Sequence, residues 1–484
     1  MLNTLQPQEV FALFNQILQI PRPSKHEEQI SQWLVDFAAQ HNIACERDQA
    51  MNVIMRVPAT PGYEEHPGVI LQAHMDMVCE KNSDVQHDFL NDPIQAYVDG
   101  DYLKAKGTTL GGDDGIGVAM ALAALISPTL KHPALECLFT VDEETGLTGA
   151  MRLQDGCLNG KKLINLDSED DAQVFIGCAG GIDTLAKMHY QPVECPKGTF
   201  AAKIKVAGLQ GGHSGDDINK RRGNSNKIMV RFLFELLQKT DLNIAYINGG
   251  NLRNAIARET EVVVCVPMAD KELLRVELNH YIATIEEEII ADEPNFFMEM
   301  QSVDTPETII SNLSMQKLIR ALYACPHGVV EMSVDMPGLV ETSTNLASIK
   351  MKENEEGHYV EINTSQRSSV ESKKHDIKNQ VECALALACD EVTHGDGYPG
   401  WKPNVHSPLL EVAKTAFEQL FEQQPQVLAI HAGLECGLFL KKYPYLDMIS
   451  IGPQMYGVHS PQERLSISST LRCWQWLCKI LESL

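Results

Sequence analysis

Short apolar runs alternate with amphipathic stretches along the first third of the chain, a pattern that predicts an α/β sheet. Val10 to Ile20 has helical spacing, and His26 to Asn42 predicts a second helix with Ser24 as its N-cap. Buried strands are expected over Val69 to Met77, Leu135 to Val141 and Lys162 to Asp167, with a helix from about Ile116 to Ser127 between the first two.

The pattern changes near Gly180-Gly181, where apolar and polar positions begin to alternate more strongly. Alternation of this kind favours an antiparallel sheet with one open face, and so an α+β region. Its expected helices are Asn226 to Gln238, Lys271 to Asp292 and Lys374 to Glu391. After a loop from Gly395 to Pro403, the α/β pattern returns with a helix (Leu409 to Gln423), a strand (Met448 to Ile451) and a last helix ending at Leu484. We therefore expect an α/β domain with a mostly parallel sheet over residues 1-182 and 398-484, interrupted by an inserted α+β domain over residues 183-397.

Composition narrows the function classes. The 484 residues and 44% hydrophobic content suit two domains, and the net charge of −25 repels phosphate backbones, so we expect no nucleic-acid partner. The polar N-terminus resembles no signal peptide and no apolar run is long enough for a membrane span, so we expect no membrane partner. The 13 cysteines form no CxxC pair, which predicts reduced thiols, a cytoplasmic location and no thiolate zinc site.

Acids and histidines follow the expected strands of the α/β domain, at the strand ends where such sheets place their sites. They are His74 and Asp76, Asp113 and Asp114, Glu143 and Glu144, Asp167 and, far downstream, His459. Each motif alone is more often a surface pair or a turn, but their joint placement is hard to obtain by chance. Carboxylates this crowded cannot all ionise without cations. Imidazole and carboxylate ligands favour zinc, manganese or cobalt over calcium, and two metals sharing a carboxylate need about five or six such ligands.

The order of these residues resembles that of the zinc aminoacylase/carboxypeptidase/dipeptidase metallopeptidase family, and within it the bacterial aminoacyl-histidine dipeptidase branch. Longer blocks make the resemblance specific, and it runs from end to end of the chain. They are Leu71-Gln-Ala-His-Met-Asp-Met-Val78, Gly107-Thr-Thr-Leu-Gly111, Gly177-Cys-Ala-Gly-Gly-Ile-Asp183, Gly211-Gly-His-Ser-Gly215 and His431-Ala-Gly-Leu-Glu-Cys-Gly-Leu-Phe439. The resemblance implies a zinc-peptidase-like catalytic domain and an inserted lid and dimerisation domain.

It also implies two Zn²⁺ per subunit, with Co²⁺ or Mn²⁺ as possible substitutes. His74 and Asp167 would hold one zinc, Glu144 and His459 the other, and Asp113 would bridge them. Glu143 would be the general base that takes a proton from a metal-bridging water, and Asp76 would orient His74. In related enzymes the peptide bond after the bridging aspartate is cis, so a cis bond is expected between Asp113 and Asp114.

Four further roles follow from the resemblance or from the residue type. His213, in the inserted domain, would stabilise the oxyanion and, in this family, often reaches across a dimer. Arg367 matches a lid arginine for the substrate carboxylate, and Asn254 a lid asparagine near the substrate. Glu435 could recognise a free α-amino group. The alternatives are a turn role for His213, surface or interface hydrogen bonding for Asn254 and Arg367, and helix capping for Glu435.

The function that these features favour is hydrolysis of unblocked dipeptides, including Xaa-His types, by a dinuclear zinc homodimer. An N-acyl-amino-acid amidohydrolase or a tripeptidase of the same family is the first alternative. A non-catalytic binding protein on the same fold is a second, disfavoured because the whole expected ligand set and Glu143 are present. A serine hydrolase is disfavoured because Asp216 replaces the last glycine of the G-x-S-x-G elbow around Ser214.

Overall fold

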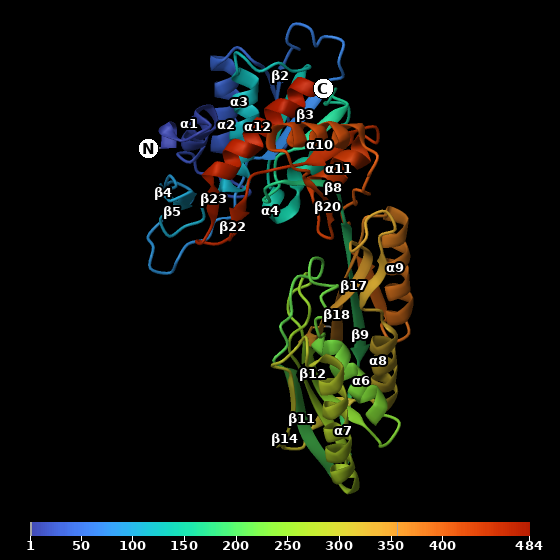
Figure 1. The fold of residues 1–484 in the computed structure, drawn as a ribbon. Helices are drawn as coiled ribbons and strands as arrows, with labels where there is room; N and C mark the ends of the chain where they lie inside the picture. The colour runs from blue at the N-terminus through green and yellow to red at the C-terminus, as the bar shows by residue number, and fades with distance from the viewer. Residues whose placement is uncertain (1, 356) are drawn as a thin grey trace. The chain divides into compact units, whose positions relative to one another are not determined.

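Two compact units make up the part of the chain that the computed structural model describes, residues 2–355 and 357–484. The first unit runs to Gly177 and resumes over Trp401–Ala429 and Leu434–Leu484, and the second comprises Cys178–Gly400 and Ile430–Gly433. In Figure 1 the first unit is accordingly drawn in colours from both ends of the scale, blue to cyan and red. The boundaries expected at 182/183 and 397/398 lie a few residues from those observed, and the return of Ile430–Gly433 to the second unit was not expected.

The first unit is built on a mixed sheet with the strand order β1-β2-β6-β3-β7-β21-β8-β20. Its strands are β1 (Ala44–Arg47), β2 (Val53–Val57), β3 (Val69–His74), β6 (Leu135–Thr140), β7 (Lys162–Asn165), β8 (Gln173–Cys178), β20 (Gln426–Ile430) and β21 (Asp447–Ser450). The central strands β6, β3, β7 and β21 are parallel, whereas the pairs β1–β2, β2–β6 and β21–β8 are antiparallel. Every residue of β3 and β6 is buried, which is typical of strands covered on both faces.

Helices flank this sheet. The expected N-cap of the second helix is wrong. The helices are α1 (Gln8–Ile17), α2 (Glu28–Gln40), α3 (Gly112–Ile126), α4 (Glu143–Gly146), α5 (Thr148–Arg152), α10 (Pro408–Phe421), α11 (Glu435–Lys442) and α12 (Ile467–Ser483). The residue before α2 is Glu27, not Ser24. The Ser24 hydroxyl instead donates to Oδ2 of Asp76 at 2.7 Å, so a tertiary contact replaces the expected cap. The short helices α4 and α5 were not among those expected, whereas a helix at Glu435, here α11, is implied by the capping alternative for that residue.

A small sheet in the first unit carries one chemically important loop. Its order is β22-β23-β5-β4, from β22 (Met455–Tyr456), β23 (Arg464–Ser466), β5 (Tyr102–Ala105) and β4 (Ala96–Asp99). The antiparallel pair of β22 and β23 closes the loop that contains His459. Because β23 also pairs with β5, this loop is anchored to a distant part of the chain.

The second unit is an antiparallel sheet covered on one side by helices, as expected for the inserted region. Its main sheet has the order β14-β11-β13-β12-β17-β18-β9-β19, with β16 beside β17. The strands are β9 (Gly180–Tyr190), β11 (Thr199–Ala207), β12 (Asn243–Gly249), β13 (Thr260–Pro267), β14 (Phe297–Val303), β16 (Gly328–Met332), β17 (Val340–Asn354), β18 (Gly357–Ser368) and β19 (Glu391–His394), with β10 (Pro192–Glu194) and β15 (Thr308–Ile310) forming a separate pair.

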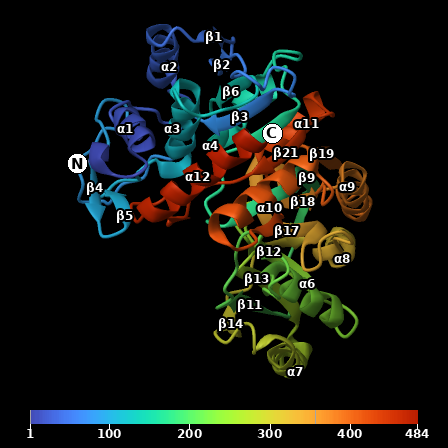
Figure 2. The same cartoon turned by 45° about the horizontal axis from the view of Figure 1, so that its top comes forward.

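The helices of this unit are α6 (Ser225–Leu236), α7 (Lys271–Ile289), α8 (Asn312–Ala324) and α9 (Glu371–Leu385), of which α8 was not expected. Figure 2 shows α6, α8 and α9 along one side of the sheet, and their apolar faces join sheet residues such as Ile204 and Val262 in one core. Among the described residues, none of the helices has the length and apolar character required to cross a membrane.

Candidate active site

The acids and histidines expected at the strand ends lie together in the first unit. Because β3, β6 and β7 are parallel, their carboxyl ends meet at one edge of the sheet. The residues brought there are His74, the last residue of β3; Asp113, in the first turn of α3; Glu143 and Glu144, which open α4 after β6; and Asp167, just after β7. The loop between β22 and β23 adds His459. The fold therefore assembles this cluster from segments that are far apart in sequence.

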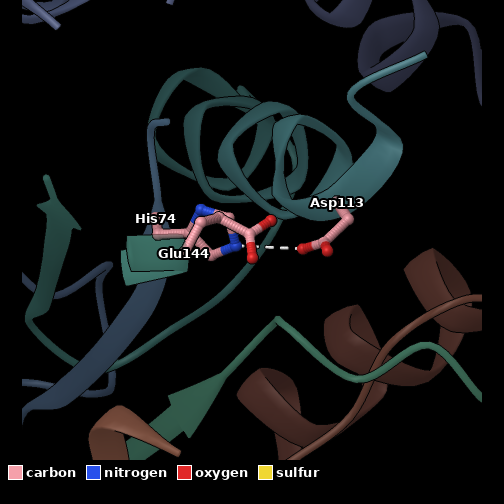
Figure 3. Close-up of side chains that lie close together, drawn as sticks. All are labelled: His74, Asp113 and Glu144. Atoms are coloured by element: carbon pink, nitrogen blue, oxygen red, sulfur yellow. Dashed lines mark hydrogen bonds and ion pairs between the residues drawn. The ribbon is translucent and has the colours of Figure 1, made fainter. Parts of the chain in front are cut away.

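Asp113 lies at the centre of the cluster. One of its carboxylate oxygens is 2.9 Å from Nε2 of His74, and the other is 3.1 Å from Nε2 of His459. Nε2 of His74 is also 3.3 Å from Asp167, and Nε2 of His459 is 3.1 Å from Glu144. Figure 3 shows His74, Asp113 and Glu144 pointing toward one another. One carboxylate thus stands between two groups, each composed of an imidazole and an acid.

Asp76 contacts both His74 and the segment that carries the two glutamates. Its Oδ1 lies 3.4 Å from Nδ1 of His74, the ring nitrogen that faces away from Asp113. The same carboxylate accepts the backbone N–H groups of Glu143 at 3.0 Å and Glu144 at 3.3 Å. A buried acid in this position holds the imidazole and the turn before α4 in fixed relation. The sequence indicated the first contact and gave no sign of the second.

The charges of the cluster fit bound cations. In the contacts described above, the carboxylates meet only imidazole, hydroxyl and backbone N–H groups. Burial raises the pKa of Asp167 to about 7, and hydrogen bonds to Asp113 and Glu144 raise the pKa of His459 to about 11. Without metal, Asp167 and His459 therefore hold protons that offset the negative charge of the crowded carboxylates. Bound metal ions would supply this positive charge in place of the protons. The donors, imidazole nitrogens and carboxylate oxygens, suit zinc, manganese or cobalt.

The peptide bond between Asp113 and Asp114 is cis, in agreement with the expectation from the family resemblance. The Asp114 side chain accepts the N–H groups of His74 at 3.3 Å and Gly117 at 3.1 Å. The two consecutive aspartates thus have different roles. Asp113 contacts the histidines, and Asp114 links the start of α3 to the end of β3 by hydrogen bonds.

Glu435 lies in the first unit, at the start of α11, and is buried. Its Oε2 accepts hydrogen bonds from Nε2 of Gln72 at 2.7 Å and Oγ1 of Thr140 at 2.8 Å, whereas its buried Oε1 has no hydrogen-bond partner. Burial raises the pKa of this carboxyl to about 8. Glu435 is also the first residue of α11, where the helix dipole favours a carboxylate, so the helix-capping alternative remains beside the substrate-binding role.

The remaining three expected residues, His213, Asn254 and Arg367, lie near one another in the second unit. The Arg367 guanidinium is 3.4 Å from Nε2 of His213, and the carbonyl of Asn254 accepts the N–H of Ser214 at 2.8 Å. Arg367 also donates to the hydroxyl of Tyr398 at 2.9 Å. Tyr398 was missed from the sequence because it stands in a loop rich in Gly and Pro that gave only a turn signal.

His431 is a further member of this second group that sequence reasoning did not assign. It is buried, its Nε2 lies 2.7 Å from Oγ of Ser343, and its Nδ1 has no hydrogen-bond partner. Burial lowers its pKa to about 3, so it is a neutral imidazole. The sequence feature that could have indicated His431 is its position at the start of the family-like block from His431 to Phe439.

Comparisons with known proteins agree on one family. The family model described as "Peptidase family M20/M25/M40" matches residues 70–483. The chain is 41% identical to the cytosol non-specific dipeptidase of Escherichia coli over 483 residues, which is 100% of this chain and 99% of that protein. Aminoacylhistidine dipeptidase from Vibrio alginolyticus has a solved structure that matches with a TM-score of 0.95 at 40% identity, over 100% of this chain and 98% of that chain. Aminopeptidase PepT from Bacillus cereus shares the fold, with a TM-score of 0.63 at 16% identity and 99% coverage of both chains.

Proposed function

Since the chain belongs to peptidase family M20/M25/M40, as the order of its motifs indicated, we propose that this metallopeptidase is a dinuclear zinc dipeptidase acting on unblocked dipeptides, including Xaa-His types. Its similarity over full length to a cytosol non-specific dipeptidase and to an aminoacylhistidine dipeptidase supports the dipeptide substrate. The name of the first relative also supports our proposal that the enzyme works in the cytoplasm.

The observation that carries the proposal is the position of Asp113 between His74 and His459. His74 and Asp167 would hold one zinc ion, His459 and Glu144 the other, and Asp113 both. When bound, the metal pair would lower the pKa of water and polarise the scissile carbonyl. Co²⁺ and Mn²⁺ accept the same donors and are expected substitutes.

Glu143 is the residue that moves the proton. Its backbone is fixed by the hydrogen bond to Asp76, and burial raises the pKa of its carboxyl well above the ordinary value. A carboxylate with raised proton affinity can take the proton from the attacking water, hold it and deliver it to the leaving nitrogen. The peptide bond of the dipeptide is then cleaved, which gives one product with a new carboxylate and one with a free amine.

The two ends of a dipeptide need opposite charges on the protein. For the substrate carboxylate we propose Arg367, whose guanidinium can form two parallel hydrogen bonds, with Asn254 as a further polar contact. For the free α-amino group we propose Glu435, because its buried Oε1 has no hydrogen-bond partner. A deacylase would need an apolar or cationic pocket at this end, so the site around the substrate's amino end distinguishes the dipeptidase from the amidohydrolase alternative.

A panel of dipeptides with free and N-acetylated amino ends tests this assignment. The wild type should prefer the free forms, and Glu435→Gln should reduce that preference by about tenfold or more, since a hydrogen bond to a charged group contributes about 1.5–3 kcal/mol. The measurement is kcat/KM for each matched pair. Glu65→Gln, at an exposed position of the same unit, is the control. A wild type that prefers acetylated substrates would instead support the amidohydrolase, and selective cleavage of tripeptides the tripeptidase.

We propose that His213 stabilises the negative oxygen that develops on the scissile carbonyl. His213→Ala should then lower kcat by about 10²–10³-fold, because an oxyanion donor acts mainly in the transition state. Metal content should stay at the wild-type value, since no ligand is lost. The control is His375→Ala, an exposed histidine of the same unit. An unaltered kcat would return His213 to a role in the turn.

We further propose that the enzyme is a homodimer assembled through the inserted unit. Apolar side chains are exposed on β16 and beyond its end, including Val330 at 42%, Met332 at 45% and Val334 at 91%. Exposed apolar residues gathered on a strand are typical of surfaces that pair with another chain. Sedimentation velocity measures the assembly state directly.

A further inference from the structure

Two buried charged side chains outside the ligand set hold one glycine turn from opposite sides. Arg22, before α2, is 2% exposed, and Glu463, just before β23, is 3% exposed. Neither is a candidate metal ligand or the general base. Buried charges are costly unless they are paired and hydrogen-bonded, so their positions call for a reason.

Glu463 binds the backbone of the turn that leads to Asp113. Its Oε2 accepts the N–H groups of Leu110 at 2.7 Å and Gly111 at 3.1 Å, and its Oε1 accepts the N–H of Gly112 at 2.7 Å. Glu463 itself belongs to the loop between β22 and β23 that carries His459. This carboxylate therefore links the His459 loop to the three residues directly before Asp113.

Arg22 binds the same turn through its carbonyl side. Its guanidinium donates to the carbonyl of Gly111, and also to the carbonyls of Met75 at 3.0 Å and Asp76 at 2.7 Å. The last two residues directly follow His74. Arg22 therefore links the end of β3 to the turn before α3. Gly111 gives its N–H to Glu463 and its carbonyl to Arg22, so the two opposite charges meet on one peptide segment.

The glycines of this turn leave room for the two side chains. A Cβ on Gly111 would lie 2.5 Å from Nη2 of Arg22, and one on Gly115 would lie 2.6 Å from the same atom. A Cβ on Gly112 would approach Oε1 of Glu463 to 3.2 Å. Gly111 also has a φ of 70°, which favours glycine. The glycines of Gly111-Gly-Asp-Asp-Gly115 thus leave space for the buried side chains of Arg22 and Glu463, and the same sequence contains the candidate metal ligand Asp113.

We propose that Arg22 and Glu463 are a positioning pair that sets the spacing of His74, Asp113 and His459. These three residues lie on separate segments, and a site for two metals requires their donor atoms to be held at fixed separations. The two side chains supply that constraint through hydrogen bonds to the backbone of the separate segments. The inference rests on the proposed metal site.

The test is metal affinity in Glu463→Gln and Arg22→Lys, measured by competition with a chromophoric zinc chelator. The glutamine NH₂ group cannot accept an N–H, so the variant loses part of the clamp, and a lysine ammonium cannot span carbonyls on two segments. Loss of such supporting contacts typically costs about 10- to 100-fold in metal affinity or activity, and we expect that for at least one of the two ions. The loss in activity should fall on kcat, with KM little changed.

A matched control lies in the same unit. Glu136 is also buried, accepts the N–H groups of Asn159 and Gly160, and pairs with Arg56, but it holds no ligand segment. Glu136→Gln should leave metal affinity at the wild-type value even where it lowers the melting temperature of the metal-free protein. Equal metal affinities for Glu463→Gln and Glu136→Gln would overturn the proposal.

If circular dichroism shows that Glu463→Gln does not fold, the zinc affinities of Glu463→Asp and Arg22→Lys are compared with that of Glu136→Gln instead. Weakened zinc binding in the folded variants supports the pair, and affinity equal to that of Glu136→Gln overturns it. Zinc binding does not depend on the substrate. A wild type that binds metal but cleaves no dipeptide would therefore refute the proposed function and leave this inference standing.

Discussion

Glu143→Gln should abolish dipeptide hydrolysis and leave the metal content of the protein unchanged. Glutamine has nearly the same shape, and the backbone hydrogen bond from Glu143 to Asp76 does not involve the substituted group. The amide cannot take a proton from water and return it to the leaving nitrogen, so kcat should fall by about 10²–10⁴-fold, the range that a positioned acid–base group contributes. KM should change little, because the loss is confined to the transition state.

The measurement combines steady-state kinetics with elemental analysis of the same preparation. Glu65→Gln makes the same chemical change at an exposed position and should behave as the wild type in both assays. Substantial activity in Glu143→Gln would refute its role in proton transfer. Lost activity accompanied by lost metal would instead place Glu143 among the ligands, next to Glu144.

Removal of metal by a chelator should eliminate activity completely. The carboxylates and imidazoles at the carboxyl ends of β3, β6 and β7 have the donor set of a metal site, and water at neutral pH is a poor nucleophile unless a cation lowers its pKa. Zinc added back should restore hydrolysis, as should cobalt or manganese, which accept the same ligands. Calcium should not, because it prefers larger shells made of oxygen ligands only.

Circular dichroism of the metal-free protein provides the control, since a folded but inactive protein separates the loss of catalysis from the loss of structure. Restoration by zinc after dialysis excludes damage by the chelator. An enzyme that stays active after its metal has been removed to the detection limit would refute the metal mechanism as a whole.

Much of the fold follows from local patterns in the sequence. The apolar runs before His74 and before Asp142 predicted β3 and β6, and the helical spacing after Gly115 predicted most of α3. The failures are equally local in origin. Helix α8 is partly polar and follows a short strand, so its pattern was weak, and Ser24 has the composition of an N-cap but is bound to Asp76, a partner 52 positions away.

Most of the candidate ligands could be proposed from sequence because they stand at strand ends, which parallel sheets bring together, whereas Asp113 follows a glycine-rich turn. His459 is a partial exception: the sequence places it after the strand Met448 to Ile451, but in the structure it stands on the β22–β23 hairpin outside the main sheet. The contacts of Asp76 with the backbone of Glu143, and the linkage of Arg22 and Glu463 through Gly111, left no trace in any pattern. They are made with backbone N–H and carbonyl groups, which all residue types except proline present alike.

The sequence by itself determined which chemistry is available: a set of acids and imidazoles without thiolates, placed after strands of an α/β domain with an inserted α+β domain. The tertiary structure alone decided how those groups face one another. It placed Asp113 between His74 and His459 and put two buried charges around one glycine turn. The physical reason is that residue type and spacing fix local conformation, whereas distances between remote segments depend on the packing of the whole unit.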